Sequence, residues 1–355
     1  MTGYLVLENG RVFKGKLLND CLMAGGEVVF TTAMISYQDI ITDPSYFGQI
    51  VVMTYPLVGN VGLNEKSFAS RLAMVSGLVL REATDFPSHY EMETDLISFL
   101  NKCEVAVLTE VDTRALTREI RSNGIMGGII TDTIEDLEQL KARAARIRAA
   151  ARKQNPVQYV TRRNIMTFGK GEKKVVMLDF GCKRGVLDSF ESRGVQVTAV
   201  PATTTASEIL ALKPDGVFIS DGPGSPEEVP YAVETTAALL GKVPLFGVGL
   251  GHQILGLTLG GSIVRMQHGH RGGNQPVRDM NSSRIYITTQ NHGYVLEKDS
   301  LNPAIAEVTL TSLNDGSVEG IRHTSLPAFS VQFDPEGYPG YSDTGFIYDD
   351  FVKML

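Results

Sequence analysis

A stretch in the second half of the chain has the pattern of a nucleophile elbow. Residues 243–248 form an apolar run that enters a cluster of glycines, and the apolar spacing from 250 to 259 is that of a helix. Strand, tight turn and helix in this order hold the turn residue in a strained conformation with its side chain above the sheet, as acyl-transfer enzymes hold a nucleophile. The turn residue here is Gly249, which has no side chain and cannot be a nucleophile.

The same glycines also raise the possibility of a phosphate-binding loop. Gly247, Gly249 and Gly251 alternate as in a dinucleotide-binding fingerprint, but His252 or Ile254 stands where the third glycine of that motif belongs. The run also follows the fourth strand of its domain instead of the first, and no strand-end acid follows about 20 residues later. The sequence therefore favours the elbow.

Composition limits the function classes. With 355 residues, 43% of them hydrophobic, the chain is long enough for two domains, and its net charge of -7 argues against binding nucleic acid. Its three cysteines, Cys21, Cys103 and Cys182, lack metal-ligand spacing, so we expect reduced thiols and no metal site. Neither a signal peptide nor an apolar run of about 20 residues is present, which predicts a cytoplasmic protein with no membrane partner.

Residues 1–160 are predicted to form a mixed α/β domain with an amphipathic helix at 91–101. Short strands bounded by turn residues are expected at 4–7, 12–13, 27–30, 49–53, 76–80 and 105–109. Between the third and fourth of these strands lies a turn at 42–46, in which spacing alone makes Ser45 a local cap on the surface.

A basic helix and a linker are expected next. Apolar residues recur at helical spacing over 133–154, after a capping-box-like pair of Thr133 and Asp136. Arg and Lys dominate its C-terminal half, which could bind an acidic partner but is more simply a solvated face. The polar segment 161–173 is predicted to be a linker, so the second domain spans 174–355.

The second domain is predicted to be a doubly wound, flavodoxin-like α/β domain. Apolar strands are expected at 175–179, 195–200, 216–220 and 243–248, with helices at 185–192 and 205–212. Strands that are apolar on both faces and joined by helices form a parallel sheet, so the elbow lies at the carboxyl edge where ligands bind. Antiparallel strands are expected afterwards at 262–264, 284–288 and 329–333.

The motifs of this domain resemble those of the class I (triad) glutamine amidotransferase family. They are Gly247, Leu250, Gly251, His252 and Gln253 at the elbow, Gly222-Pro223-Gly224 before it, and Pro335-Glu336 near the end. Segments 26–32, 42–46, 55–60, 179–181 and 290–294 narrow the resemblance to the small subunit of carbamoyl-phosphate synthase. The resemblance covers essentially the whole chain and displaces the interpretation of Ser45 as a local cap.

The resemblance implies a reaction and a partner. In that family the small subunit hydrolyses glutamine, and the ammonia passes to a large subunit that makes carbamoyl phosphate for arginine or pyrimidine biosynthesis. It implies no cofactor in this chain, with ATP and Mg²⁺ bound by the large subunit. Hydrolysis uses a Cys thiolate at the elbow, a His that takes and returns its proton, a Glu that orients the His, and backbone N–H groups for the oxyanion.

Carried over by position, the catalytic set is degenerate. The Cys falls on Gly249 and the His on Asp334, so only the orienting acid, Glu336, remains. An unperturbed Asp has a pKa of about 3.9 and is a poor base near neutrality. We also expect the two neighbouring carboxylates to have no cation between them. Two simultaneous losses favour natural decay of the glutaminase over a designed knockout.

The positions that bind glutamine are better retained. By resemblance they are Ser45, Gly222, Gly224, Leu250, Gln253, Asn291, Gly293 and Tyr294. Among them, Gly224 and Leu250 would offer their N–H groups to the oxyanion. The glycines also suit tight turns without any ligand, and Gln253 also suits a first helical turn as an ordinary polar residue.

Three functions remain open. The favoured one is a structural or regulatory partner of a large subunit that takes free ammonia, in other words a pseudoenzyme. The second is an active glutaminase with a substitute nucleophile, for which Cys182, in the loop after the first strand of its domain, is the candidate. The third is a glutamine sensor whose pocket binds glutamine unproductively.

Overall fold

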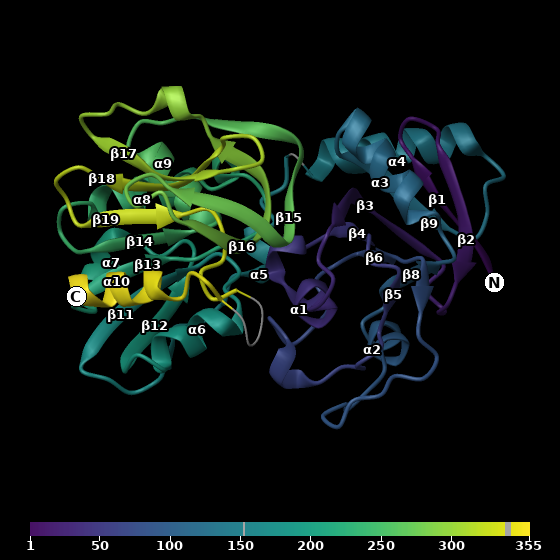
Figure 1. Ribbon diagram of the computed structural model, residues 1–355, viewed down its shortest axis with the longest axis horizontal. Helices are drawn as coiled ribbons and strands as arrows, with labels where there is room; N and C mark the ends of the chain where they lie inside the picture. The colour runs from purple at the N-terminus through teal and green to yellow at the C-terminus, as the bar shows by residue number, and fades with distance from the viewer. Residues whose placement is uncertain (152, 338–341) are drawn as a thin grey trace. The chain divides into compact units, whose positions relative to one another are not determined.

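The computed structural model describes residues 1–151, 153–337 and 342–355, which divide into the compact units Met1–Gln154 and Asn155–Leu355 (Figure 1). The segment 161–173, expected to be a linker, is instead part of the second unit. Its strand β10 (Met166–Phe168) pairs with β12 (Val195–Pro201). Thr161 Oγ1 donates a hydrogen bond of 2.6 Å to the carbonyl of Asp179. These contacts fix the segment to the sheet.

The first unit is built on a closed barrel of strands in the order β1-β2-β8-β6-β4-β3-β9. Its elements are β1 (Thr2–Leu7), β2 (Val12–Leu17), β3 (Met23–Thr31), α1 (Tyr37–Thr42), η1 (Pro44–Tyr46), β4 (Gln49–Met53), β5 (Leu57–Val58), η2 (Glu65–Ser67), β6 (Gly77–Val79), β7 (Glu82–Ala83), α2 (Leu96–Lys102), β8 (Ala106–Thr109), α3 (Thr113–Asn123), β9 (Met126–Thr131) and α4 (Leu137–Ala151).

Alternating apolar residues explain the core of the barrel. Leu5 and Leu7 are two residues apart on β1, as are Ile50 and Val52 on β4, so each pair points to one face and joins one buried cluster. The expected strands are present, whereas the closure of the barrel and α3 were not predicted. Helix α4 begins later than expected, because Asp136 Oδ1 accepts from the N–H of Gln139 at 2.8 Å and caps it.

The second unit combines a parallel sheet with an antiparallel extension. Its elements are α5 (Val157–Val160), β10, β11 (Lys173–Asp179), α6 (Arg184–Glu191), β12, α7 (Ala206–Ala211), β13 (Gly216–Ile219), η3 (Pro226–Glu228), α8 (Pro230–Leu239), β14 (Leu245–Val248), α9 (Leu250–Thr258), β15 (Ile263–Asp279), β16 (Ile285–Leu296), η4 (Lys298–Ser300), β17 (Ala306–Ser312), β18 (Val318–His323), β19 (Ala328–Val331) and α10 (Phe346–Met354).

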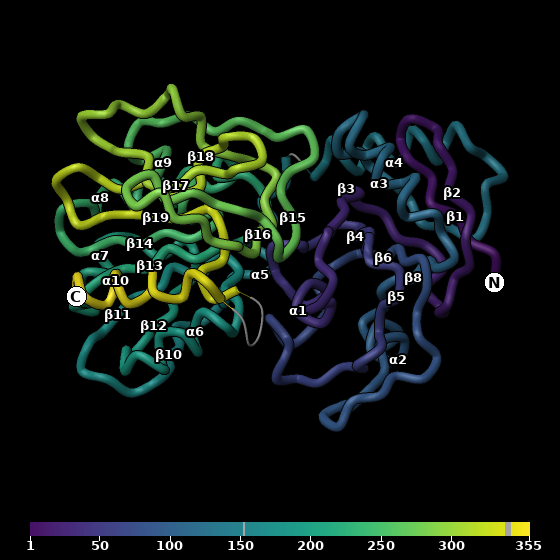
Figure 2. Tube along the Cα trace, viewed as in Figure 1, coloured from purple at the N-terminus to yellow at the C-terminus, as the bar shows by residue number. Residues whose placement is uncertain are grey.

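The predicted doubly wound sheet is confirmed. Strands β12-β11-β13-β14-β19 lie side by side and parallel, and β18, β17, β15 and β16 continue the sheet as antiparallel pairs. Residues 329–333 were expected to be antiparallel to their neighbours. This is right for β18 and wrong for β14, to which β19 is parallel. Strand β19 forms a hairpin with β18, so the chain returns beside β14 in the parallel direction (Figure 2).

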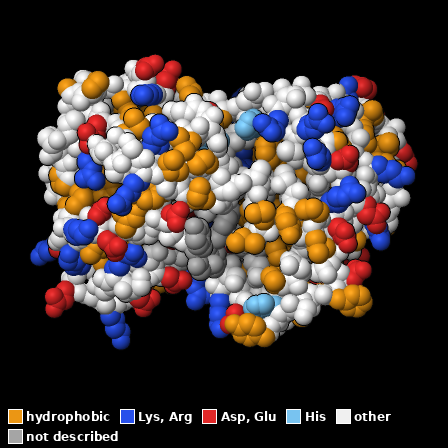
Figure 3. Space-filling view, viewed as in Figure 1, with side chains coloured by type: hydrophobic (Ala, Val, Ile, Leu, Met, Phe, Trp, Pro, Cys, Tyr) orange, Lys and Arg blue, Asp and Glu red, His pale blue; other side chains and the backbone are white. Residues whose placement is uncertain are grey.

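Both faces of the parallel sheet are covered. Side chains of α7, α8 and α9 join one buried cluster, and those of α6 and α10 join another that is rich in aromatic rings. The carboxyl ends of the strands are therefore held on a rigid support. Side chains of both charges are interspersed on the face of each unit in Figure 3. Within the described ranges, no helix has the length and apolarity that a membrane crossing requires.

Candidate functional site

The elbow has the backbone expected of it. Gly249 lies between β14 and α9 with φ 56° and ψ -113°, a left-handed conformation that favours glycine. Its N–H donates a hydrogen bond of 3.0 Å to the carbonyl of Val331, which ties the turn to β19. A Cβ atom at this position would overlap the carboxylate of Asp221. The elbow therefore keeps its shape, but another side chain fills the place of a nucleophile.

Asp221 also engages the expected oxyanion site. It follows β13, and its Oδ1 accepts a hydrogen bond of 2.8 Å from the backbone N–H of Leu250. This N–H is one of the two that the resemblance assigns to the oxyanion. A fixed negative charge at this point opposes the development of a second one. Gly222 follows directly, and its close approach to the carbonyl of Phe180 leaves no room for a Cβ atom there.

The position of the catalytic base is occupied by a buried ion cluster. Lys183 Nζ lies 2.7 Å from Asp334 Oδ2 and 3.3 Å from Glu336 Oε1, and the three side chains are only 4–6% exposed. The expectation that the two carboxylates lack a cation is therefore wrong. Lys183 comes from the loop after β11. The chain was compared with the family at the triad positions, and Lys183 is not one of them. We call Lys183, Asp334 and Glu336 the lysine cluster.

The lysine cluster is poorly suited to general base catalysis. An ammonium group is a donor only, and both carboxylates are turned toward Lys183 instead of toward the elbow residue as a base would be. Tyr348 closes the cluster from α10, since its hydroxyl donates to Glu336 Oε2 at 2.9 Å. Burial and the Glu336 carboxylate raise the pKa of Tyr348 well above its usual value, which keeps this donor protonated.

The residues expected to bind glutamine are brought together only in part. Gln253, buried on the first turn of α9, donates from Nε2 to the carbonyl of Tyr294 at 3.2 Å and to Gln332 Oε1 at 3.1 Å. Asn291 and Gly293 lie beside Tyr294 on β16, and Gly224 lies between β13 and η3. The amide of Gln253 thus holds β16 against the elbow helix, a structural contact that needs no ligand.

Ser45 belongs to the first unit. It is buried in η1, where its Oγ donates to Asp43 Oδ1 at 2.6 Å and its N–H to the same oxygen at 2.8 Å. The cap of this turn is therefore Asp43, and the turn is not on the surface. The role of Ser45 in binding glutamine stays a prediction.

Cys182 has the chemistry of a structural thiol. Its Sγ donates to the carbonyl of Lys183 at 3.2 Å. Desolvation, together with the carboxylates of Asp179 and Glu336, raises the pKa of the thiol well above its usual value. Because the thiolate is the nucleophilic form, this residue is a poor substitute for a cysteine at the elbow.

Asp221 and Lys183 were missed by reasoning from the sequence. Both lie just past the carboxyl end of a parallel strand, Asp221 after β13 and Lys183 after β11. Residues just past the carboxyl ends of parallel strands lie along one edge of a doubly wound sheet, where ligands bind, so this placement was the available signal.

Comparisons with known proteins cover both units. A model of the family described as "Glutamine amidotransferase class-I" matches residues 176–354, and one described as "Carbamoyl-phosphate synthase small chain, CPSase domain" matches residues 5–130. The chain is 43% identical to a carbamoyl phosphate synthase small chain from Staphylococcus haemolyticus over 99% of its own length and 95% of that protein's. It is also 43% identical to the small chain of Clostridium perfringens, over 99% of each.

Proposed function

Because the chain belongs to the carbamoyl-phosphate synthase small-chain family, we propose that it is a small subunit without glutaminase activity. It binds a carbamoyl-phosphate synthase large subunit and acts as its structural or regulatory partner. The large subunit, with ATP and Mg²⁺, then takes free ammonia to make carbamoyl phosphate for arginine or pyrimidine biosynthesis.

The observation that carries this proposal is the position of the Asp221 carboxylate. It fills the volume above Gly249 and accepts the Leu250 N–H, so one side chain stands in the places of both nucleophile and oxyanion. Loss of a single donor from an oxyanion site typically slows catalysis by about 10² to 10³-fold. Here the donor is engaged, the nucleophile is missing, and an ion pair stands at the base position.

The same geometry argues against the two alternative functions. An active glutaminase needs a thiolate, and the pKa of Cys182 is raised. A glutamine sensor needs room for the substrate carbonyl beside Leu250, where the carboxylate of Asp221 lies. Calorimetric titration of the chain with glutamine should therefore give no heat of binding, and a saturable heat would favour the sensor.

The decisive assay uses the chain together with its large subunit. We expect the two to copurify, and the complex to make carbamoyl phosphate from ammonium but not from glutamine. A glutamine-dependent rate well above that of the large subunit alone would overturn the proposal. A chain that stays monomeric beside the large subunit would contradict the partnership. An arginine or a uracil requirement of a deletion strain would separate the two pathways.

A gain-of-function variant tests the cause of the loss. The triple variant Asp221→Ala/Gly249→Cys/Asp334→His removes the blocking carboxylate and supplies thiol and imidazole. We expect it to release glutamate from glutamine, at a rate measurable by coupled assay, where the parent chain releases none. The matched control, Asp221→Ala/Gly249→Ala/Asp334→His, lacks only the thiol and should be inactive.

A further inference from the structure

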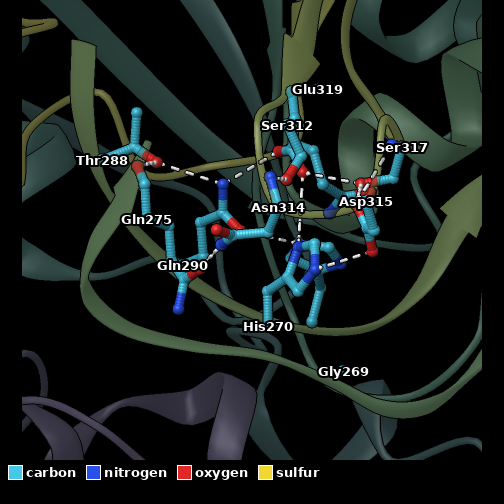
Figure 4. A network of polar contacts seen from close by, with 12 residues as sticks. Gly269, His270, Gln275, Thr288, Gln290, Ser312, Asn314, Asp315, Ser317 and Glu319 are labelled. Carbon is cyan, nitrogen blue, oxygen red and sulfur yellow. Dashed lines mark hydrogen bonds and ion pairs between the residues drawn. The ribbon is translucent and has the colours of Figure 1, made fainter. Parts of the chain in front are cut away.

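Three buried side chains with metal-ligating atoms converge away from the elbow. His270 on β15, His292 on β16 and Glu319 on β18 place one ligand atom each within 4.8 Å of the others. Figure 4 shows His270 and Glu319 pointing toward one another across the strands, with Gln290 and Asp315 beside them. The proposed function uses none of the three. We call them the imidazole cluster.

The distances in the imidazole cluster are close to those of a metal site. His270 Nδ1 lies 3.5 Å from Glu319 Oε1, and His292 Nε2 lies 3.9 Å from the same oxygen. Ligands placed tetrahedrally at about 2.0–2.1 Å from Zn²⁺ are about 3.4 Å apart. The two imidazole–carboxylate distances would therefore need to shorten by only a few tenths of an ångström, while the ligand atoms of the two imidazoles lie within 4.8 Å of one another and would approach further on binding.

The outer contacts of the two imidazoles turn a lone pair inward on each ring. His270 Nε2 lies 3.0 Å from Asp315 Oδ2, and His292 Nδ1 lies 3.0 Å from the carbonyl of Tyr294. Both partners are acceptors, so each can take a hydrogen from the outer nitrogen, and in that tautomer the inner nitrogen keeps its lone pair. This arrangement, a ring N–H donated to a carboxylate or a carbonyl, is typical of metal-binding histidines. His270 Nδ1 is buried and forms no hydrogen bond among the described residues.

Glu319 is likewise oriented by an outer partner. Gln290 Nε2 donates to Glu319 Oε2 at 3.0 Å, which leaves Oε1 facing the imidazoles. Ser317 Oγ adds a longer contact of 3.3 Å to Oε1. The Glu319 side chain is 0% exposed, and in the described part of the chain its only ion-pair partners are the two imidazoles. A fully buried carboxylate with no fixed cation is stabilised by a positive charge nearby.

Without a metal ion, hydrogen bonds from the residues that the structure describes do not satisfy all the polar atoms of the imidazole cluster. His292 Nε2 also lies 3.2 Å from Gln290 Oε1, which is another acceptor. A neutral imidazole has one hydrogen and cannot donate to both Gln290 and Tyr294. A cation at the centre would accept the lone pair instead.

We propose that His270, His292 and Glu319 bind a divalent transition-metal ion of the Zn²⁺ class. Two imidazoles and one carboxylate are a common donor set for Zn²⁺. A cavity of about 460 Å³ is lined in part by Asp315 and Ser317, the residues that contact His270 and Glu319 from outside the cluster. This proposal stands against the expectation from the sequence that the chain has no metal site, and the titration below decides between them.

The ion would link three strands. Because β16 also carries Asn291, Gly293 and Tyr294, a metal at His292 fixes the strand that is predicted to face glutamine. The ion therefore acts on the stability of the β15–β16 ribbon, independently of any reaction at the elbow.

The test is a titration of the full chain after chelator treatment. We expect one Zn²⁺ per chain by calorimetry and by elemental analysis, and Co²⁺ in its place should give the intense visible absorption of a low-coordinate site. Zn²⁺ should raise the melting temperature, because a ligand that binds only the folded state stabilises it. Absence of Zn²⁺ and Co²⁺ binding by the folded, stripped chain would overturn the proposal.

Variants localise the site. Glu319→Gln keeps the shape of the side chain and should weaken Zn²⁺ binding at least tenfold, whereas His89→Asn, in the first unit, should leave it unchanged. Circular dichroism checks that both variants are folded. Unchanged affinity in folded Glu319→Gln would also overturn the proposal. If this variant does not fold, the change in melting temperature of the parent chain on chelator treatment tests the proposal instead. None of these readouts depends on glutamine or on the large subunit.

Discussion

The second unit holds two buried carboxylate clusters that solve the same electrostatic problem differently. In the lysine cluster, Asp334 and Glu336 contact the ammonium of Lys183, a cation that belongs to the chain itself. In the imidazole cluster, Glu319 faces His270 and His292, whose charge depends on protonation. Desolvation opposes protonation of His270, but Glu319 and Asp315 together raise its pKa.

This difference decides which cluster can accept a ligand. A buried carboxylate requires a positive charge, and where lysine supplies it the site is complete and has no base to offer. Where only imidazoles are available, the charge can come from a proton or from a metal ion. The family resemblance predicts an imidazole at position 334, where this chain has Asp. His270 and His292, to which the resemblance assigns no role of their own, are present.

Breaking the lysine cluster should have the largest effect on stability. Lys183→Met leaves two buried carboxylates without their cation, so we expect the free energy of unfolding to fall by about 3–5 kcal/mol. Denaturant titration measures this change. The control Lys170→Met, at an exposed lysine, should stay within about 0.5 kcal/mol of the parent. A loss below about 1 kcal/mol at Lys183 would mean that the carboxylates are not charged.

The elbow backbone should show the next largest effect. Gly249→Ala forces a Cβ atom into a left-handed conformation and against Asp221, and we expect a loss of about 1–3 kcal/mol. Gly260 also has a positive φ, of 86°, but a Cβ atom there would meet nothing within 4 Å. Gly260→Ala therefore measures backbone strain alone. Equal losses in the two variants would show that Asp221 moves aside freely.

The fold was largely predictable because its signals are local. Continuous apolar strands separated by helices predict β11, β12, β13 and β14 and their parallel direction, and turn residues separate the strands of the first unit. The direction of β19 was wrong because pairing is set by the long excursion through β15 to β18. Closure of the barrel depends likewise on the pairing of β1 with β9, which no local pattern encodes.

The sequence predicted which positions belong to the site, but not which side chains contact them. Local pattern placed Gly249 at the carboxyl edge of the sheet, and the family resemblance assigned Asp334 and Glu336 to the same site; in the structure they follow β14 and β19. The partners that define their chemistry, Lys183 and Asp221, come from other loops, and side-chain geometry alone shows that they arrive there. The pairing of His270 with Glu319 likewise depends on the register of strands far apart in the sequence.

The imidazole of His252 is buried outside both clusters and shows what desolvation does to a histidine that has no carboxylate partner among its described contacts. His252 lies in α9 with Nδ1 2.9 Å from Ser330 Oγ, and desolvation lowers its pKa to about 3. Because the pKa in the folded state lies below the unfolded value of about 6.5, its stabilising effect is complete above pH 6.5. This effect is lost by about 1.4 kcal/mol per pH unit as the pH falls from 6.5 toward 3.

Denaturant midpoints at several pH values between 6.5 and 4.5 test this expectation. His252→Asn, which removes the titrating group, should make the pH dependence of the free energy of unfolding shallower by about 1.4 kcal/mol per unit. An unchanged slope would mean that His252 is protonated in the folded chain or that other groups carry the whole dependence.

The outer partner of the imidazole cluster should have the smallest effect on stability. The side chain of Asp315 is 41% exposed, so its contact with His270 is screened by solvent. Asp315→Asn should change the free energy of unfolding of the stripped chain by less than about 1 kcal/mol.

If the cluster binds a metal, the same substitution should weaken Zn²⁺ binding about 10- to 100-fold, because an outer carboxylate orients a metal-binding imidazole. A small change in stability together with a large change in Zn²⁺ affinity would show that the imidazole cluster accepts a ligand, unlike the lysine cluster, whose cation is part of the chain. A large stability loss with unchanged affinity would place Asp315 in a network of the kind that Lys183 forms.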